Sequence, residues 1–149
     1  MQFYSTDGSY ENSARLSEDQ WPVPTPSLTR WTSEIVEGIK SLGLEPEPGP
    51  KLETWVREAG FINVAHHLLP IPVGDWPKDK KLKQIGKADL LQFLDGLDAI
   101  SLRVFTTTRG WKPEEVQVLL ADVRRTLKDR GVHAQHDFHV VYGQRPWNS

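Results

Sequence analysis

A helix-to-strand turn centred on Gly60 is the sequence feature that most constrains how this chain can fold. Pro50 can open a helix, whose inward side is formed by Leu52, Trp55, Val56 and Ala59. Glycine is typical of a helix C-terminus, because it adopts a left-handed backbone without steric cost. Residues 61–69 are then rich in apolar and β-branched side chains, which predicts a strand that Pro70 and Pro72 end.

Three longer helices are predicted from apolar residues that recur at spacings of three and four. They cover residues 26–42, 82–108 and 113–130. The first begins at Thr25 and Pro26, a hydroxyl N-cap followed by proline at the first helical position. The second contains Gly86 and Gly96, which make a break or kink possible. Three of the six tryptophans fall at positions predicted to pack in the core: Trp31, Trp55 and Trp111.

The two ends of the chain differ in predicted order. Residues 133–142 alternate in polarity, which predicts a last strand. Residues 1–25 are polar and rich in proline, so we expect an irregular N-terminal segment there. Residues 26–149 then form a single α/β domain, a normal size for one core.

Composition excludes several classes of protein and site. The net charge of −2, with both signs mixed, argues against a nucleic-acid-binding surface. The chain has no cysteine, which excludes disulfides, thiolate nucleophiles and zinc–cysteine sites. The first seven residues have neither the basic nor the apolar region of a signal peptide, so we expect none, and no apolar run reaches membrane-spanning length. We therefore expect a cytoplasmic protein that binds neither nucleic acid nor membrane.

An ordered series of motifs resembles the carboxyl-terminal part of fungal LaeA-like class I methyltransferases. The matching segments are residues 3–8, 51–64, 71–86, 90–97, 110–116, and 133–134 followed by 140–143. The second of these includes the Ala-Gly-Phe turn at residues 59–61. The resemblance implies a truncated Rossmann-like fold with few antiparallel strands covered by helices. It also implies that the last strand lies antiparallel beside the strand that follows the turn.

The resemblance also has consequences for the methyl donor. The family uses S-adenosylmethionine, held by a glycine-rich turn between a strand and a helix. This chain has no glycine cluster in such a position, so no cofactor-binding residues carry over from the family. We therefore expect that the chain alone does not bind S-adenosylmethionine tightly.

Three residues are candidates for catalysis: His133, His136 and Arg109. A carboxylate beside a histidine fixes its tautomer and can make it a general base. Asp137 and His139 are two residues apart on the last strand and share one face with His133, whereas His136 points to the other face. Arg109 can hold an acidic group of a substrate. The competing interpretation is structural: partly buried or exposed strand histidines, and a surface arginine that caps a helix.

Three tryptophans are candidates for substrate binding: Trp76, Trp111 and Trp21. Trp21 and Trp76 adjoin prolines, and Trp111 shares a loop with Arg109, so they can line a hydrophobic cleft or an interface. Adjacent His66 and His67 point to opposite faces of a strand and cannot ligate one metal together. No histidine spacing matches a metal motif, and no metal site is expected.

Three functions from different classes remain open, so the sequence leaves open whether the chain is an enzyme. The first is a LaeA-like methyltransferase of secondary metabolism that needs a donor-binding half from another chain. The second is a donor-independent cyclase or isomerase that acts on a small hydrophobic biosynthetic intermediate. The third is a non-catalytic binding or scaffolding protein. Because a two-stranded sheet is marginal alone, we also expect a homo-oligomer or a partner chain.

Overall fold

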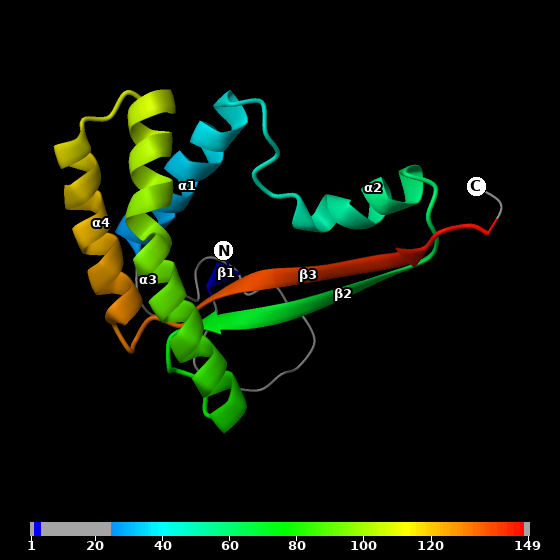
Figure 1. The fold of residues 1–149 in the computed structure, drawn as a ribbon. Helices are drawn as coiled ribbons and strands as arrows, with labels where there is room; N and C mark the ends of the chain where they lie inside the picture. The colour runs from blue at the N-terminus through cyan, green and yellow to red at the C-terminus, as the bar shows by residue number, and fades with distance from the viewer. Residues whose placement is uncertain (1, 4–24, 148–149) are drawn as a thin grey trace.

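A bundle of three helices and a long two-stranded arm make up the described part of the chain (Figure 1). The computed structural model describes residues 2–3 and 25–147. The bundle contains α1 (Pro26–Ser41), α3 (Lys80–Thr108) and α4 (Pro113–Lys128). The arm contains β2 (Ile62–Val73) and β3 (Ala134–Gln144), with η2 (Gly49–Lys51) and α2 (Leu52–Glu58) packed on it. This arrangement confirms the predicted α/β fold with few antiparallel strands.

The sheet has the order β1-β3-β2, in which β1 is the short strand Gln2–Phe3. β3 is antiparallel to both neighbours, so β1 and β2 run parallel to each other. β1 corrects the expectation that residues 1–25 are wholly irregular; residues 4–24 lie outside the described part. The predicted antiparallel pairing of the two long strands is confirmed.

The two prolines expected to end β2 lie within it. Pro70 is paired with Asp137 and Pro72 with Gln135, and the strand continues to Val73. β2 is at the edge of the sheet, and residues two apart present their backbone nitrogen to the same side. Proline is tolerated at an edge when the missing N–H faces away from the neighbouring strand. The prediction treated both prolines as strand breakers because the sequence does not show which strands are at an edge.

Helix α3 runs without a break through the glycines at which a kink was considered possible. The Asp79 side chain accepts a hydrogen bond from the Leu82 amide (2.8 Å), which starts the helix at Lys80. Gly86 lies against the turn that follows β2, where the Gly74 amide donates to the Gly86 carbonyl (2.9 Å). A Cβ at residue 86 would lie only 2.0 Å from the Gly74 carbonyl oxygen. Gly86 therefore permits close helix–turn packing.

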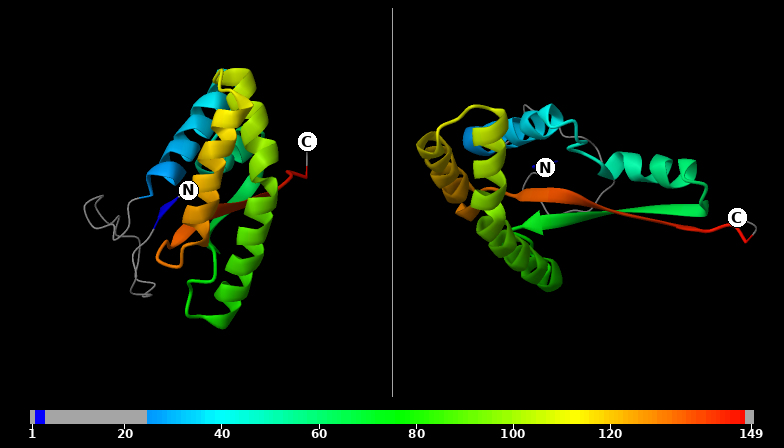
Figure 2. Two further views of the ribbon diagram at one scale, coloured as in Figure 1. Left: turned by 90° about the vertical axis from the view of Figure 1, so that its left-hand side faces the viewer. Right: turned by 45° about the horizontal axis from the view of Figure 1, so that its top comes forward.

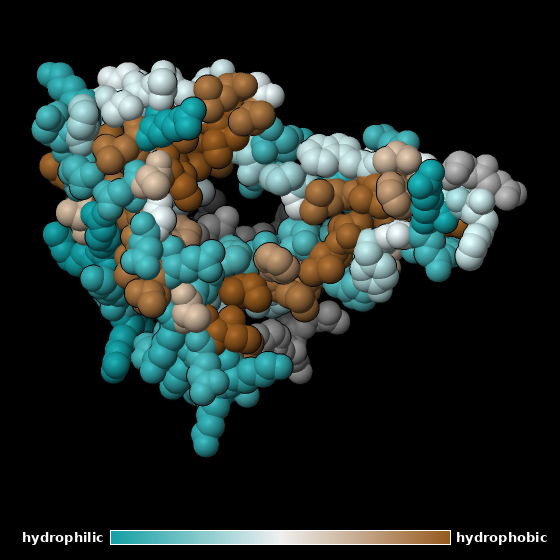
Figure 3. Space-filling view, in the orientation of Figure 1, coloured by the Kyte–Doolittle hydropathy of each residue, from teal (hydrophilic) through white to brown (hydrophobic). Residues whose placement is uncertain are grey.

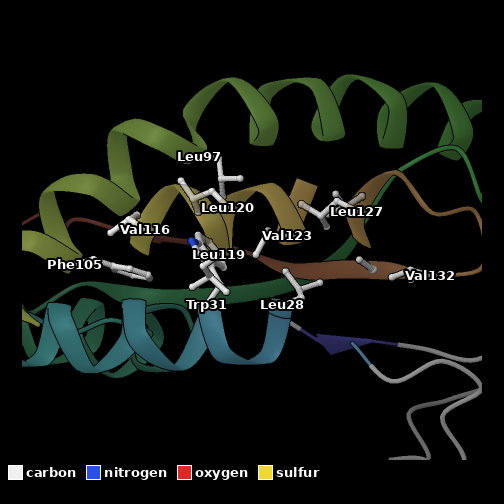
Figure 4. Close-up of a cluster of buried hydrophobic side chains, with 12 residues drawn as sticks. Leu28, Trp31, Leu97, Phe105, Val116, Leu119, Leu120, Val123, Leu127 and Val132 are labelled. Carbon is white, nitrogen blue, oxygen red and sulfur yellow. The ribbon is translucent and has the colours of Figure 1, made fainter. Parts of the chain in front are cut away.

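The hydrophobic core lies mainly among the three bundle helices (Figure 4). Trp31 of α1 and Phe105 of α3 are among its largest side chains, and α4 contributes five buried residues: Val116, Leu119, Leu120, Val123 and Leu127. Buried Ser101 accepts a hydrogen bond from Trp31 Nε1 (2.8 Å) and donates to the Leu97 carbonyl (2.6 Å). The base of the sheet joins this core through Val73 and Ala134.

The arm extends away from this core, as two further views show (Figure 2). Helix α2 lies on the arm and has no buried residue. Trp55, predicted to be a core residue, is 42% exposed, and this prediction is wrong. The apolar periodicity of α2 is real, but α2 packs only on the two strands of the arm and not on the bundle. Periodicity therefore identified the inward side of α2 without showing how little lies against it.

Candidate functional site

The candidate site lies where the carboxyl ends of β1 and β2 meet the amino end of β3. Phe3 and Val73 are both paired with Ala134, so all three strands meet at this residue. The loop from β2 to α3 and the loop from α4 to β3 lie at the same edge. Loops held by a rigid scaffold commonly carry binding and catalytic residues, and two of the residues predicted from sequence, Trp76 and His133, lie in these loops.

Trp76 and His133 form a stacked pair at this edge. Their rings lie 4.8 Å apart at an angle of 9°, and Trp76 Nε1 donates to the Ala134 carbonyl (3.0 Å). This bond fixes the indole at the start of β3, and the indole in turn supports the imidazole. His133 Nδ1 is buried and has no hydrogen-bond partner among the described residues. A buried polar atom without a partner is uncommon and points to an unfilled interaction.

His136 lies three residues further along β3 and contacts α3. Its Nε2 lies 3.1 Å from Oδ2 of Asp89, and both side chains are partly buried. If Nε2 carries the proton and donates to the carboxylate, the lone pair is on Nδ1, which can then accept a proton. The structure thus supplies a histidine–carboxylate pair between His136 and Asp89, whereas the neighbours considered from sequence were His139 and Asp137.

Arg109 and Trp111 lie elsewhere, at the carboxyl end of α3. Arg109 Nε donates to Oε2 of Glu34 (2.8 Å), and this hydrogen bond raises the pKa of Arg109. Trp111 packs against Phe105 and beneath the guanidinium of Arg30 (4.7 Å). Twenty residues of helix separate Arg109 from Asp89, which is about 30 Å. The structure therefore does not bring these candidates together with His133 and His136, and Trp21 lies outside the described residues.

A second histidine network holds α2 on the arm. His66 Nε2 lies 2.8 Å from His139 Nδ1, and His66 Nδ1 lies 3.4 Å from Oε2 of Glu53. A hydrogen bond from Arg57, assisted by His66, lowers the pKa of Glu53. The His139 ring also packs against Gly49, where a Cβ would lie 2.4 Å from it. As predicted, His66 and His67 point to opposite faces, and His67 stacks on Tyr142 instead.

The sequence analysis missed both acidic partners, Asp89 and Glu53. Asp89 lies one helical turn after Gly86, the glycine that brings α3 close to the sheet. That spacing places Asp89 on the sheet-facing side of α3 and is the signal by which it could have been found. Among the described residues, no group of three or more histidines and acids is arranged to hold a metal ion.

An open hollow of about 410 Å³ lies between α1 and the segment that leads to α2. Its charged side chains are largely paired, because Lys40 contacts Glu37 and Lys51 contacts Glu45. The hollow contains none of the candidate residues. None of the helices in the described ranges combines the length and hydropathy needed to cross a bilayer.

Sequence comparisons relate the chain to fungal methyltransferases. It is 37% identical over 131 residues to methyltransferase pytC of Aspergillus terreus, which covers 88% of this chain and 40% of that protein. It is 32% identical over 119 residues to the probable methyltransferase tdiE of Emericella nidulans, covering 80% and 38%. It is 30% identical over 130 residues to the secondary metabolism regulator LAE1 of Cochliobolus heterostrophus, covering 86% and 42%.

The chain thus spans about 40% of the length of these curated relatives. No family model matches it. No solved structure matches it either.

Proposed function

Because this chain belongs to the LaeA-like family of fungal methyltransferases, we propose that it forms the acceptor side of a methyltransferase of secondary metabolism. In this proposal the 149 residues orient a small hydrophobic biosynthetic intermediate. S-Adenosylmethionine is bound by a donor-binding half that these residues do not supply.

The observation that carries this proposal is the grouping of two side-chain pairs at the carboxyl edge of the sheet. Trp76 and His133 present a flat aromatic surface with a buried, unpartnered nitrogen. His136, two residues beyond Ala134 on β3, adds a histidine–carboxylate pair with Asp89 of α3. An aromatic surface with a few polar groups nearby is a common composition of a small-molecule site.

The chemistry available to these residues suits a nucleophile that loses a proton. An amine or hydroxyl that becomes methylated must release its proton, and Nδ1 of His136 can accept it while Asp89 holds the proton on Nε2. One relative, gliN of Aspergillus fumigatus, is named an N-methyltransferase. We therefore favour a substrate that stacks on Trp76 and is methylated on a nitrogen or oxygen atom.

The residues present do not fit the methyl donor. Gly74 follows β2 and precedes α3, so its turn occupies the position of a donor loop between a strand and a helix. Its amide is bonded to the Gly86 carbonyl, and its own carbonyl lies against Gly86. Backbone groups of this turn are therefore used for packing α3.

Titration calorimetry with S-adenosylmethionine tests the donor half of the proposal. The chain alone should show no binding at micromolar concentrations. A chimera in which this chain replaces the matching 131-residue region of methyltransferase pytC should bind the donor. Micromolar binding by the chain alone contradicts the proposal that the donor half lies elsewhere.

Methyl transfer by the same chimera tests the acceptor half. His136→Gln should lower kcat by about 10²- to 10⁴-fold, the usual contribution of a general base, with donor affinity unchanged. Asp89→Asn should lower kcat in the same direction. Asp95→Asn on the same helix is the matched control, because Asp95 is exposed and outside the site. Equal activity of all three variants contradicts the role of the His136–Asp89 pair.

A donor-independent isomerase or cyclase is a second candidate function. The His136–Asp89 pair favours it, because proton transfer from and to a substrate needs no methyl donor. To separate the two functions, the chain alone is incubated with small hydrophobic biosynthetic intermediates. An isomer or cyclised product is then detected as a change in chromatographic retention without a change in mass. Turnover by the chain alone that His136→Gln abolishes supports the second function over the first.

A further inference from the structure

One face of the arm carries a strip of uncovered apolar side chains. Leu69, Phe138 and Tyr142 are 48%, 53% and 57% exposed. The apolar strip is defined here as these three residues with Ala65, His67 and Val140. Hydrophobic residues are visible along the arm in the space-filling view (Figure 3). Singly exposed apolar residues are ordinary, but a contiguous row of them marks an interaction surface.

The strand register places all six residues on one face. The direct cross-strand pairs are Leu69 with Phe138, His67 with Val140, and Ala65 with Tyr142. Side chains alternate between faces, so these three successive same-face pairs form a continuous surface. The His67 ring also stacks on Tyr142, 5.6 Å between centroids. None of the six carries a formal charge while His67 is neutral.

The apolar strip lies on the same face of the sheet as the area that α3 covers, and it continues that area along the arm. Helix α3 covers the same face at the bundle end, where Val73 and Ala134 are buried and His136 contacts Asp89. Along this face, the pair Ile71–His136 follows Val73–Ala134, and the strip begins with the next pair, Leu69–Phe138. Helix α2 lies on the opposite face, since its Glu53 contacts His66. The arm also projects from the bundle (Figure 1).

We propose that the apolar strip is a homodimer interface, occupied by the strip of a second copy of this chain. Two sheet faces pack well when their apolar side chains interdigitate about 10 Å apart. A second copy offers a ribbon of the same twist and the same three cross-strand pairs. A two-fold axis brings the strip onto itself, and the absence of charge means that no like-charge repulsion opposes this contact. The two-stranded arm gains the second covered face that such a ribbon needs.

Sedimentation-velocity centrifugation of the full chain tests this proposal. We expect a dimer at micromolar concentration, and Phe138→Glu should raise the dimer dissociation constant at least tenfold, because each copy would bury a carboxylate. Leu91→Glu is the control: Leu91 is 63% exposed on α3 and lies outside the strip, so this variant should remain dimeric. Circular dichroism confirms that each variant is folded.

Cross-linking gives an independent readout, because the chain has no cysteine of its own. Val140 belongs to the central pair of the strip and lies near its own copy across a two-fold axis. Val140→Cys treated with a short bismaleimide should therefore give a covalent dimer in high yield, and Leu91→Cys should not. A monomer throughout the micromolar range overturns the proposal. So does a dimer that Phe138→Glu leaves intact, since another surface would then hold it. Binding of S-adenosylmethionine does not enter either test, so this proposal and the proposed function can fail separately.

Discussion

Single residues in this protein acquire their roles from partners distant in sequence. The five histidines show this most clearly, since all lie on or beside β2 and β3. His133 is stacked on Trp76, His136 contacts Asp89, and His66 contacts His139. Only the first two pairs lie at the carboxyl edge of the sheet, where a ligand is expected. A histidine in this chain is therefore a functional candidate by position and not by residue type.

Ser101 provides a residue-scale prediction about the core. It accepts the buried Trp31 N–H, so Ser101→Ala leaves that donor unpaired and should lower the free energy of unfolding by about 1–3 kcal/mol. The double variant Trp31→Phe with Ser101→Ala removes both partners. In urea unfolding, the loss on removing Ser101 should be smaller in the Trp31→Phe background. Additive losses would show that the hydrogen bond carries no coupling.

Glycines in α3 provide a second prediction at this scale. Gly86→Ala places a methyl group against the Gly74 backbone and should destabilise the protein by about 1–3 kcal/mol through overpacking. Gly96→Ala is the matched control in the same helix, because nothing lies within 4 Å of the added Cβ. It should stabilise by about 0.5–1 kcal/mol, since alanine favours a helix interior. Thermal unfolding of the two variants should therefore shift in opposite directions.

Elements differ in how firmly they are held, and α2 is the least buried of the helices in the described chain. The three bundle helices each contribute buried residues to one core, whereas α2 contributes none. Its attachment depends on the Glu53–His66–His139 network and on partly buried Leu52 and Val56. Elements with few buried contacts open at low free energy. We therefore expect α2 to detach from the arm before the bundle unfolds.

Acid should promote this opening. The pKa of Glu53 is lowered in the folded protein, so its ionised form contributes stability above the unfolded pKa that is lost as pH falls through the folded pKa. The protection factors of the α2 amides, which correct for the slower intrinsic exchange in acid, should therefore fall between about pH 5 and pH 3, where exposed glutamates titrate.

Two comparisons make this prediction specific. Glu53→Gln should already show fast α2 exchange at neutral pH, with a weaker dependence on acid. Five buried residues anchor α4, so the protection factors of its amides should not change over the same pH range. Parallel loss of protection in α2 and α4 would mean that the network does not control α2 separately.

At the scale of the whole molecule, the bundle and the arm have different requirements. The bundle has a core of its own, whereas the arm is a ribbon with α2 on one face and the apolar strip on the other. Dimerisation through the strip would make stability depend on protein concentration, because association favours the folded form. The midpoint of thermal unfolding should rise with concentration for the natural chain. It should be independent of concentration for Phe138→Glu.

The sequence by itself determined the local elements. Apolar periodicity, N-terminal prolines and glycine stops identified all four α-helices and both long strands, since these signals depend on residues a few positions apart. The ordered motifs also predicted the family and the antiparallel neighbours. Two of the site residues, Trp76 and His133, were named from sequence, but their stacking was not.

Only the tertiary structure decided which side chains meet. The sequence separations are 57 residues between Trp76 and His133, 47 between Asp89 and His136, and 73 between His66 and His139. Contacts at such range depend on strand order and register, which local propensity does not encode. The same reason explains why Pro70 and Pro72 are tolerated at an edge and why Trp55 remains exposed. The turn at Gly60 directs the chain from α2 into β2, and the pairing of β3 with β1 and β2 places the candidate residues at one end of the sheet.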